Sequence, residues 1–146
     1  MLDIMARLLV LSALSTLILA HMQMLIPSPL RDPHANRANE PKDYNILQPL
    51  HADVSDFACK GWHLNTPWTT VATYEAVGTY DMTLKGSVTH GGGSCQLSMS
   101  FDGGSEFKII QSMEGGCPIN KRYRFKIPKE LGKGRKRSTG LFAWTW

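Results

Sequence analysis

A histidine stands where a secretory leader would end. Residues 1–20 have a short polar start that carries Arg7, an apolar run from Leu8 to Leu19, and a small residue, Ala20. This three-part order is typical of a signal peptide, and the apolar run is too short for a membrane span, which takes roughly 20 apolar residues. We therefore expect residues 1–20 to be a signal peptide, so that the secreted, extracellular chain begins at His21.

An N-terminal histidine can hold a metal ion with two nitrogens of one residue, its α-amine and its ring Nδ1. The α-amine has an unperturbed pKa of about 7.7–8.0, against about 10.4 for lysine. A metal can therefore displace its proton near neutral pH at small cost. One more imidazole would bring the number of nitrogen ligands to three, arranged in a T shape within a roughly square plane. This geometry with nitrogen ligands favours copper(II). His21 is thus a candidate copper ligand.

The sequence offers several histidines for that third nitrogen: His34, His51, His63 and His90. The first three lie in an irregular segment among polar residues, where we expect exposed loop histidines. His90 instead ends a strand-like run and precedes three glycines, residues 91–93. A sheet would hold such a ligand in place, and glycines would leave open space beside it. The alternative for His90 is a hydrogen-bonded histidine at the edge of a sandwich.

The elements that must position these residues change in pattern near Pro67. Before it, prolines punctuate a polar segment without periodicity, which indicates long loops with short extended pieces. After it, apolar and polar residues alternate in the runs 80–88, 95–101, 123–127, 142–146 and, more weakly, 107–113. Short strands between Gly-rich turns, with no amphipathic helix, predict an all-β fold. We expect an antiparallel β-sandwich of the immunoglobulin or fibronectin-III type with long N-terminal loops.

The chain has three cysteines, Cys59, Cys95 and Cys117. An odd number in an oxidising compartment leaves one thiol without an intramolecular partner. Cys95 shares its strand parity with Leu97, so its side chain should point inward, and Cys117 lies in a Gly-rich turn about one strand later. A Cys95–Cys117 disulfide would close a loop of about twenty residues and contribute roughly 3 kcal/mol.

Length and charge limit the other function classes. Without residues 1–20 the 146-residue chain has room for one domain with a core, but not for two. Much of the net charge of +4 lies in the run 133–137, which we interpret as a solvated loop. No aromatic interleaving or motif supports nucleic-acid binding. We also expect no membrane association after signal cleavage, and a monomer.

Several blocks of the sequence, in this order, are similar to those of one enzyme family. They are His21-Met22, Pro27-Ser28-Pro29, Ser55 to Lys60, His90 to Gln96, Lys108 to Pro118, Phe125 to Pro128 and Ala143 to Trp146. With them the chain resembles the lytic polysaccharide monooxygenases of auxiliary activity family 11 over nearly all of the expected mature sequence. The His-Gly-Gly-Gly-Ser-Cys and Glu-Gly-Gly-Cys-Pro blocks are specific together, whereas each alone is weak.

The resemblance implies a copper enzyme that degrades chitin. In such enzymes the N-terminal histidine and one internal histidine bind copper on a flat face of the sandwich, and the matching positions here are His21 and His90. They would be both metal ligands and catalytic residues. Dioxygen or hydrogen peroxide and an external electron donor would drive hydroxylation of a glycosidic carbon in crystalline chitin, which breaks the polysaccharide chain. The Cys95–Cys117 disulfide also agrees with the family pattern.

The chain departs from the family pattern in two places. Relatives carry a tyrosine in the axial region of the copper and a cysteine that pairs with the one at Cys59, both in a segment that would follow Trp146. We therefore expect residues 21–146 to be a copper monooxygenase domain that is incomplete at its C-terminus. Tyr74, Tyr80 and Tyr123 fit strand faces better than this axial role. The connection between Pro118 and Tyr123 is also shorter than in relatives.

Two other functions stay open from the sequence. The first is a secreted copper-binding sandwich without catalysis, a carrier or sequestration protein, in which Met22 and Met24 could act as soft ligands, although such methionines more often pack. The second is a carbohydrate-binding module without redox chemistry. Such modules present rows of surface aromatics, for which Trp62 and Trp68 are loose candidates.

Overall fold

The computed structural model describes residues 21–132, 134 and 137–146. The expected signal peptide, residues 1–20, lies outside the described residues, and so do three residues of the basic run 133–137. Within the described ranges, no helix is long and apolar enough to cross a membrane.

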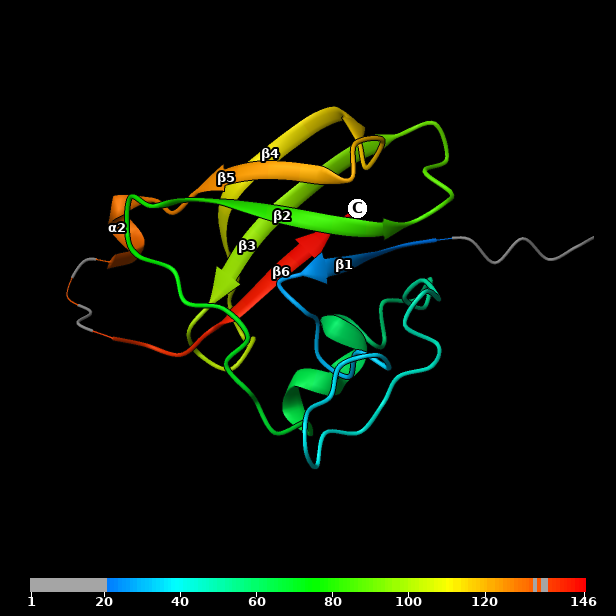
Figure 1. The fold of residues 1–146 in the computed structure, drawn as a ribbon, viewed down its shortest axis with the longest axis horizontal. Coiled ribbons are helices and arrows are strands. Elements are labelled where there is room, and N and C mark those ends of the chain that lie inside the picture. The colour runs from blue at the N-terminus through cyan, green and yellow to red at the C-terminus, as the bar shows by residue number, and fades with distance from the viewer. Residues whose placement is uncertain (1–20, 133, 135–136) are drawn as a thin grey trace, which may run out of the picture.

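The strands form two three-stranded antiparallel sheets (Figure 1). One sheet has the order β1-β2-β5, built from Met22–Ile26, Thr79–Gly86 and Arg122–Lys126. The other has the order β4-β3-β6, built from Lys108–Cys117, Gly93–Ser100 and Leu141–Thr145. All pairs of neighbouring strands are antiparallel. The prediction of an all-β antiparallel sandwich is confirmed.

The core draws its side chains from both sheets, in the inward parity that the sequence pattern predicts for β2 and β5. Its buried members are Met22, Met82, Leu84, Leu97, Phe125 and Ile127. Aromatic side chains, among them Tyr74, Tyr80 and Phe142, are partly buried against this cluster. Period-two alternation therefore identified the buried face of these strands correctly.

Strand β3 keeps the predicted alternation only as far as Leu97. Ser98 and Ser100 were expected to face solvent, but both are buried. The pairing with β4 shifts register between Leu97 and Ser98. Beyond the end of the strand the following turn folds back, so that the Ser100 hydroxyl donates to Asp102 Oδ1 (2.7 Å) and accepts from the Gly104 amide (2.9 Å). These hydrogen bonds satisfy the buried hydroxyl of Ser100, which the sequence pattern could not show.

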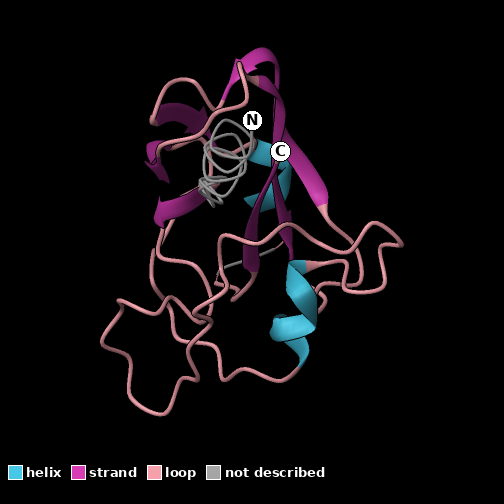
Figure 2. Ribbon diagram, turned by 90° about the vertical axis from the view of Figure 1, so that its right-hand side faces the viewer, coloured by secondary structure: helices cyan, strands magenta, loops and turns pink. Residues whose placement is uncertain are grey.

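Residues 27–78 form an irregular region, most of which lies below β1 and β6 in Figure 1 and at the bottom of Figure 2. Its last residues rise to the start of β2, where the Val77 amide donates to the carbonyl of Ile127 (2.9 Å). The long N-terminal loops are as predicted. Two short helical pieces were not predicted: the 3₁₀ segment η1, Cys59–Leu64, inside this region, and α2, Lys129–Gly132, after β5. Strand β1 is one of the expected extended pieces, yet its first two residues are both buried, so it shows no alternation.

Ion pairs and hydrogen bonds hold this irregular region together. Arg37 Nε lies 2.5 Å from Glu40 Oε2, and Lys60 Nζ lies 3.1 Å from Asp43 Oδ2. The guanidinium of Arg31 lies over the ring of Trp62, 3.9 Å from its centroid, which is a cation–π contact. The hydrogen bond from Arg37 lowers the pKa of Glu40 below its ordinary value, although burial opposes the shift. These contacts fix a segment that contributes few side chains to the apolar core.

Candidate metal site

His21 is positioned by the start of β1, which pairs with the end of β2. Met22 lies opposite Gly86 in this ladder. A Cβ at Gly86 would lie 2.4 Å from the carbonyl oxygen of His21 and 2.9 Å from Cα of Met22, and the φ of Gly86 is +142°. Only glycine permits both this backbone conformation and this close approach. The absence of a side chain at Gly86 therefore places His21 against the end of β2.

His90 lies in a tight turn between β2 and β3. The amide of Gly92 donates to the carbonyl of Thr89 (2.7 Å), and the two central residues, His90 and Gly91, have φ values of +48° and +75°. Positive φ at both central positions is the pattern of a type I′ turn. Histidine is one of the few residues with a side chain that is enriched in this backbone region. The turn presents the exposed imidazole of His90 at the end of the sandwich.

The structure brings the two predicted ligands together. The ring centroids of His21 and His90 are 5.6 Å apart, with 39° between the ring planes. Metal–nitrogen bonds of about 2.0–2.1 Å leave room for one ion bound by a nitrogen of each ring. Neutral imidazoles suit copper among the transition metals. The residues present therefore fit a copper ion, with the two rings as ligands and the α-amine of a processed His21 as a third nitrogen.

The other histidines do not join this pair. His34 and His51 are exposed, as expected. The same expectation is wrong for His63, which is only 8% exposed. A Cβ at Gly104 would lie 2.5 Å from Cδ2 of His63, so this ring packs tightly against the turn after β3. Nδ1 of His63 has no hydrogen-bond partner in the described part of the chain.

Groups of three or more His, Cys, Asp or Glu side chains placed to hold a metal do not occur among the described residues. His21 and His90 are two candidate ligands, and the third nitrogen that the sequence predicts, the α-amine of His21, is a main-chain group.

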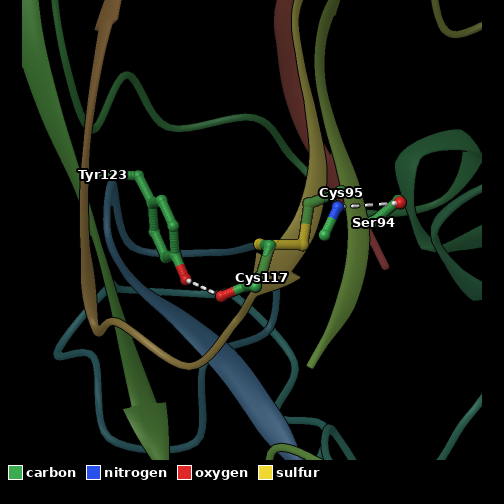
Figure 3. Close-up of a disulfide and its surroundings, with 6 residues drawn as sticks. Ser94, Cys95, Cys117 and Tyr123 are labelled. Atoms are coloured by element: carbon green, nitrogen blue, oxygen red, sulfur yellow. Dashed lines mark hydrogen bonds between the residues drawn. A yellow bond between two sulfur atoms is a disulfide. The ribbon is translucent and has the colours of Figure 1, made fainter. Parts of the chain in front are cut away.

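A disulfide ties the strands directly beside this site. Cys95 and Cys117 are bonded, as predicted, with their Cα atoms 5.9 Å apart. Figure 3 shows two hydrogen bonds around it: the Gly115 amide donates to Ser94 Oγ (3.3 Å), and the hydroxyl of Tyr123 donates to the Gly116 carbonyl (3.5 Å). Because Gly93 pairs with Cys117, these contacts anchor the first residues of β3, immediately after the His90 turn.

The third cysteine lies elsewhere. Cys59 begins η1 and forms no disulfide with another described residue. Burial raises the pKa of its thiol. Cys59 is partly buried, and a thiol with a raised pKa is poorly reactive.

Two residues of the site were missed by sequence reasoning. One is Gly86, whose role is steric. The other is Trp146, whose ring centroid lies 5.7 Å from that of His90, with 32° between the planes. The inward alternation of β6 assigned Trp146 to the sandwich face, yet its side chain remains 41% exposed at the end of the sheet. Glycine in a strand was the available signal for Gly86, whereas the contact of Trp146 with His90 needed the fold.

The tyrosines and methionines considered above serve the core. Tyr74 packs on Tyr80 and Phe125 at ring-centroid distances of 4.7 and 5.6 Å, and burial raises its pKa to about 12. The side chain of Met22 belongs to the buried cluster, and Met24 packs against it. These contacts favour a packing role for both methionines over thioether ligation.

The two tryptophans considered for carbohydrate stacking are tied into the irregular region. Arg31 covers a face of Trp62, whose Nε1 donates to Asp43 Oδ2 (3.2 Å). Nε1 of Trp68 donates to the carbonyl of His63 (2.9 Å). The ring of Trp62 is therefore covered by Arg31, whereas Trp68 remains 38% exposed.

Comparison with known proteins identifies relatives over most of the chain, although no family model matches it. It is 53% identical over 135 residues to AA11 family lytic polysaccharide monooxygenase A of Aspergillus fumigatus, covering 90% of this chain and 59% of that protein. It is 33% identical over 148 residues to AA11 family lytic polysaccharide monooxygenase B of A. fumigatus, covering 87% of this chain and 32% of the relative. An AA11 family lytic polysaccharide monooxygenase of Aspergillus oryzae is also 33% identical, over 145 residues, with 86% and 31% covered.

The chain thus spans 59% of the first relative's length and about a third of the other two. The alignments cover 86–90% of this chain. Over the residues that it spans, the chain is similar to AA11 family lytic polysaccharide monooxygenases, at 53% identity to the first relative and 33% to the other two.

Proposed function

We propose that this protein is a secreted copper-dependent monooxygenase that cleaves glycosidic bonds in crystalline polysaccharide, with chitin as the substrate. The observation that carries the proposal is the pairing of His21 and His90, whose ring centroids lie 5.6 Å apart at one end of the sandwich. The relatives named as lytic polysaccharide monooxygenases support the reaction class. Dioxygen or hydrogen peroxide would be the oxidant, and an external donor would supply electrons.

Each residue of the pair has a separate task. His21 would contribute its ring and its α-amine, the latter only after cleavage of the Ala20–His21 bond, because an amide nitrogen is not a comparable base. His90 would contribute its ring from a turn that is fixed by β2 and β3. Bound copper would supply the redox chemistry needed to attack an unactivated C–H bond. The protein would hold the ligand nitrogens in a fixed arrangement around the metal.

The surroundings of His90 suit an extended, flat substrate. A Cβ at Gly91, Gly115 or Gly116 would meet no heavy atom within 4 Å, so these positions border open space. Without side chains they leave a low surface beside the imidazole, which a polysaccharide chain in a crystal face could approach. The Cys95–Cys117 disulfide supports an oxidising, extracellular location. The protein would act as a monomer.

The test is product formation from chitin by the processed chain beginning at His21, loaded with copper and supplied with ascorbate. Mass spectrometry should detect oxidised chito-oligosaccharides. His90→Asn removes the imidazole but keeps a residue that tolerates positive φ, so it should abolish these products without unfolding the turn. A chain that retains Ala20 is the matched control for the amine, and it too should lose activity.

Each outcome decides between functions. Unchanged product with His90→Asn would refute the metal assignment. Tight copper binding without oxidised product would favour the non-catalytic copper carrier, and binding to chitin that a chelator leaves unaffected, without oxidised product, would favour a carbohydrate-binding module.

A further inference from the structure

His90 is held by ring packing in the described structure. Its ring packs against His21 and against Trp146, at centroid distances of 5.6 and 5.7 Å. Within the described residues, no hydrogen bond to either ring nitrogen of His90 is present. A metal-binding histidine is usually oriented by a hydrogen bond to its second nitrogen. Here the neighbouring aromatic ring is the available constraint on its orientation.

Trp146 is itself fixed to the sheet. Its ring stacks with that of Trp144 at a centroid distance of 6.4 Å and an interplanar angle of 16°. Trp144 pairs with Leu97 across the β6–β3 ladder and packs against the buried cluster. The side chain of Trp144 thereby connects Trp146, and its contact with His90, to the core.

Gly93 supplies an independent observation. It is the first residue of β3, and its φ lies outside the left-handed range, so its backbone does not require glycine. A Cβ at this position would lie 3.0 Å from Nε1 of Trp146, closer than ordinary van der Waals contact. The lack of a side chain at Gly93 therefore provides the space that the indole occupies beside His90.

We propose that Trp146 is a positioning residue for His90, which holds the imidazole plane ready for the metal and does not itself bind it. Centroid separations of about 4.5–7 Å are those at which aromatic rings attract each other. The inference deepens the proposed function and rests on it where copper is concerned. Without the indole, the exposed imidazole of His90 would be free to rotate. The free energy needed to order it would then reduce the affinity for the metal.

The experiment compares copper(II) affinity, by calorimetry, in the processed chain beginning at His21 and in four variants. Trp146→Leu removes the aromatic ring and Trp146→Phe keeps one. Gly93→Ala keeps Trp146 but adds a methyl group that would push its indole away from its present position. Thr145→Ala is the matched control, because it alters the exposed neighbour on the opposite face of β6. Proton NMR of the metal-free chains reports the ring protons of His90, which lie within the ring current of the indole.

We expect Trp146→Leu to weaken copper binding roughly tenfold, as loss of an orienting partner does for a metal ligand. It should also shift the His90 ring resonances in the metal-free protein. Trp146→Phe should recover most of the affinity, Gly93→Ala should cause a smaller change in the same direction, and Thr145→Ala should change neither quantity. Should Trp146→Leu fail to fold, Trp146→Phe and Gly93→Ala still test the inference.

Unaltered affinity and unaltered His90 resonances in Trp146→Leu, or a Trp146→Phe chain as weak as Trp146→Leu, would overturn the inference. The proposed function fails differently. In that case the unmodified chain would bind copper no better than His90→Asn, while the metal-free NMR spectra would still show whether Trp146 orders His90.

Discussion

At the scale of single residues, the site depends on two backbone features that carry no chemistry of their own. Gly86 lets β1 approach β2, and the left-handed turn at His90 and Gly91 raises the imidazole at the end of the sandwich. A residue with a side chain in this turn costs free energy that the surrounding structure must offset. Such strain, next to a candidate ligand, agrees with a functional role for His90.

Substitution of Gly86 by alanine should disturb His21 without touching either imidazole. The new Cβ would clash with main-chain atoms of residues 21 and 22 and would demand an unfavourable φ. We expect a loss of about 1–3 kcal/mol in the free energy of unfolding, together with weaker copper binding, measured by urea denaturation and calorimetry.

The variant Gly103→Ala separates the effect of an unfavourable φ from the effect of a clash with the main chain. Its φ is +82°, yet a Cβ there would meet nothing within 4 Å, so it suffers strain without a clash and lies away from His21. It should destabilise the protein by about 1 kcal/mol and leave copper affinity unchanged. Equal copper affinities in Gly86→Ala and the unmodified chain would show that the β1–β2 contact does not position His21.

At the scale of elements, the sandwich presents both candidate ligands at one end. β1 begins at Met22, directly after His21, and β2 ends at Gly86, the partner of Met22. β3 begins at Gly93, three residues after His90. The Cys95–Cys117 disulfide then joins β3 to the end of β4 at this same end. The loop that bears His90 is therefore held by β2 before it and β3 after it, and the Cys95–Cys117 disulfide fixes the start of β3.

The disulfide should contribute to stability chiefly by restricting the unfolded chain. Its sequence separation is 22 residues, for which the chain-entropy model gives roughly 3 kcal/mol. The double variant Cys95→Ala/Cys117→Ala should lose about that amount in urea denaturation. Cys59→Ala, which removes a cysteine outside any disulfide of the described chain, is the control and should cost less. A double variant as stable as the control would contradict this account.

At the scale of the whole molecule, sequence patterns predicted the alternating burial along regular strands but missed burial that arises from a single turn or register shift. Period-two alternation identified the buried faces of β2 and β5, because one face of each strand meets the core. It failed after Leu97, where a register shift and a returning turn bury the other parity too. His63 was misjudged for a similar reason, since the polar segment around it predicts exposure while η1 packs it against Gly104.

The candidate metal ligands could be predicted from the sequence, but the contacts that position them could not. An N-terminal histidine and a histidine followed by glycines are visible in the sequence because their chemistry depends on residue type. The contact of Trp146 with His90 depends on the register of β6 with β3, which no local pattern encodes. The polar network of residues 27–66 was equally hidden, since its pairs are set by the path of an irregular chain.

That polar network makes the stability of the whole molecule depend on pH. The pKa values of Asp32, Glu40 and Asp43 are all lowered from their ordinary values. Burial raises the pKa of Asp43, but hydrogen bonds from Lys60, Trp62 and the Asn45 amide outweigh it. Because the folded pKa lies below the unfolded value of about 3.9–4.3, the stabilisation is present above that range. It is lost as pH falls through the folded pKa values.

Urea denaturation between pH 7 and pH 3 should therefore show a free energy of unfolding that declines below about pH 4. Glu40→Gln should cost about 3 kcal/mol at pH 7, because it leaves the nearly buried Arg37 without its anionic partner, and its decline with acid should be shallower. Glu106→Gln, at an exposed carboxylate, is the control and should follow the unmodified chain. If Glu40→Gln and the unmodified chain instead lost stability in parallel down to pH 3, the Arg37–Glu40 pair would not be a source of the acid sensitivity.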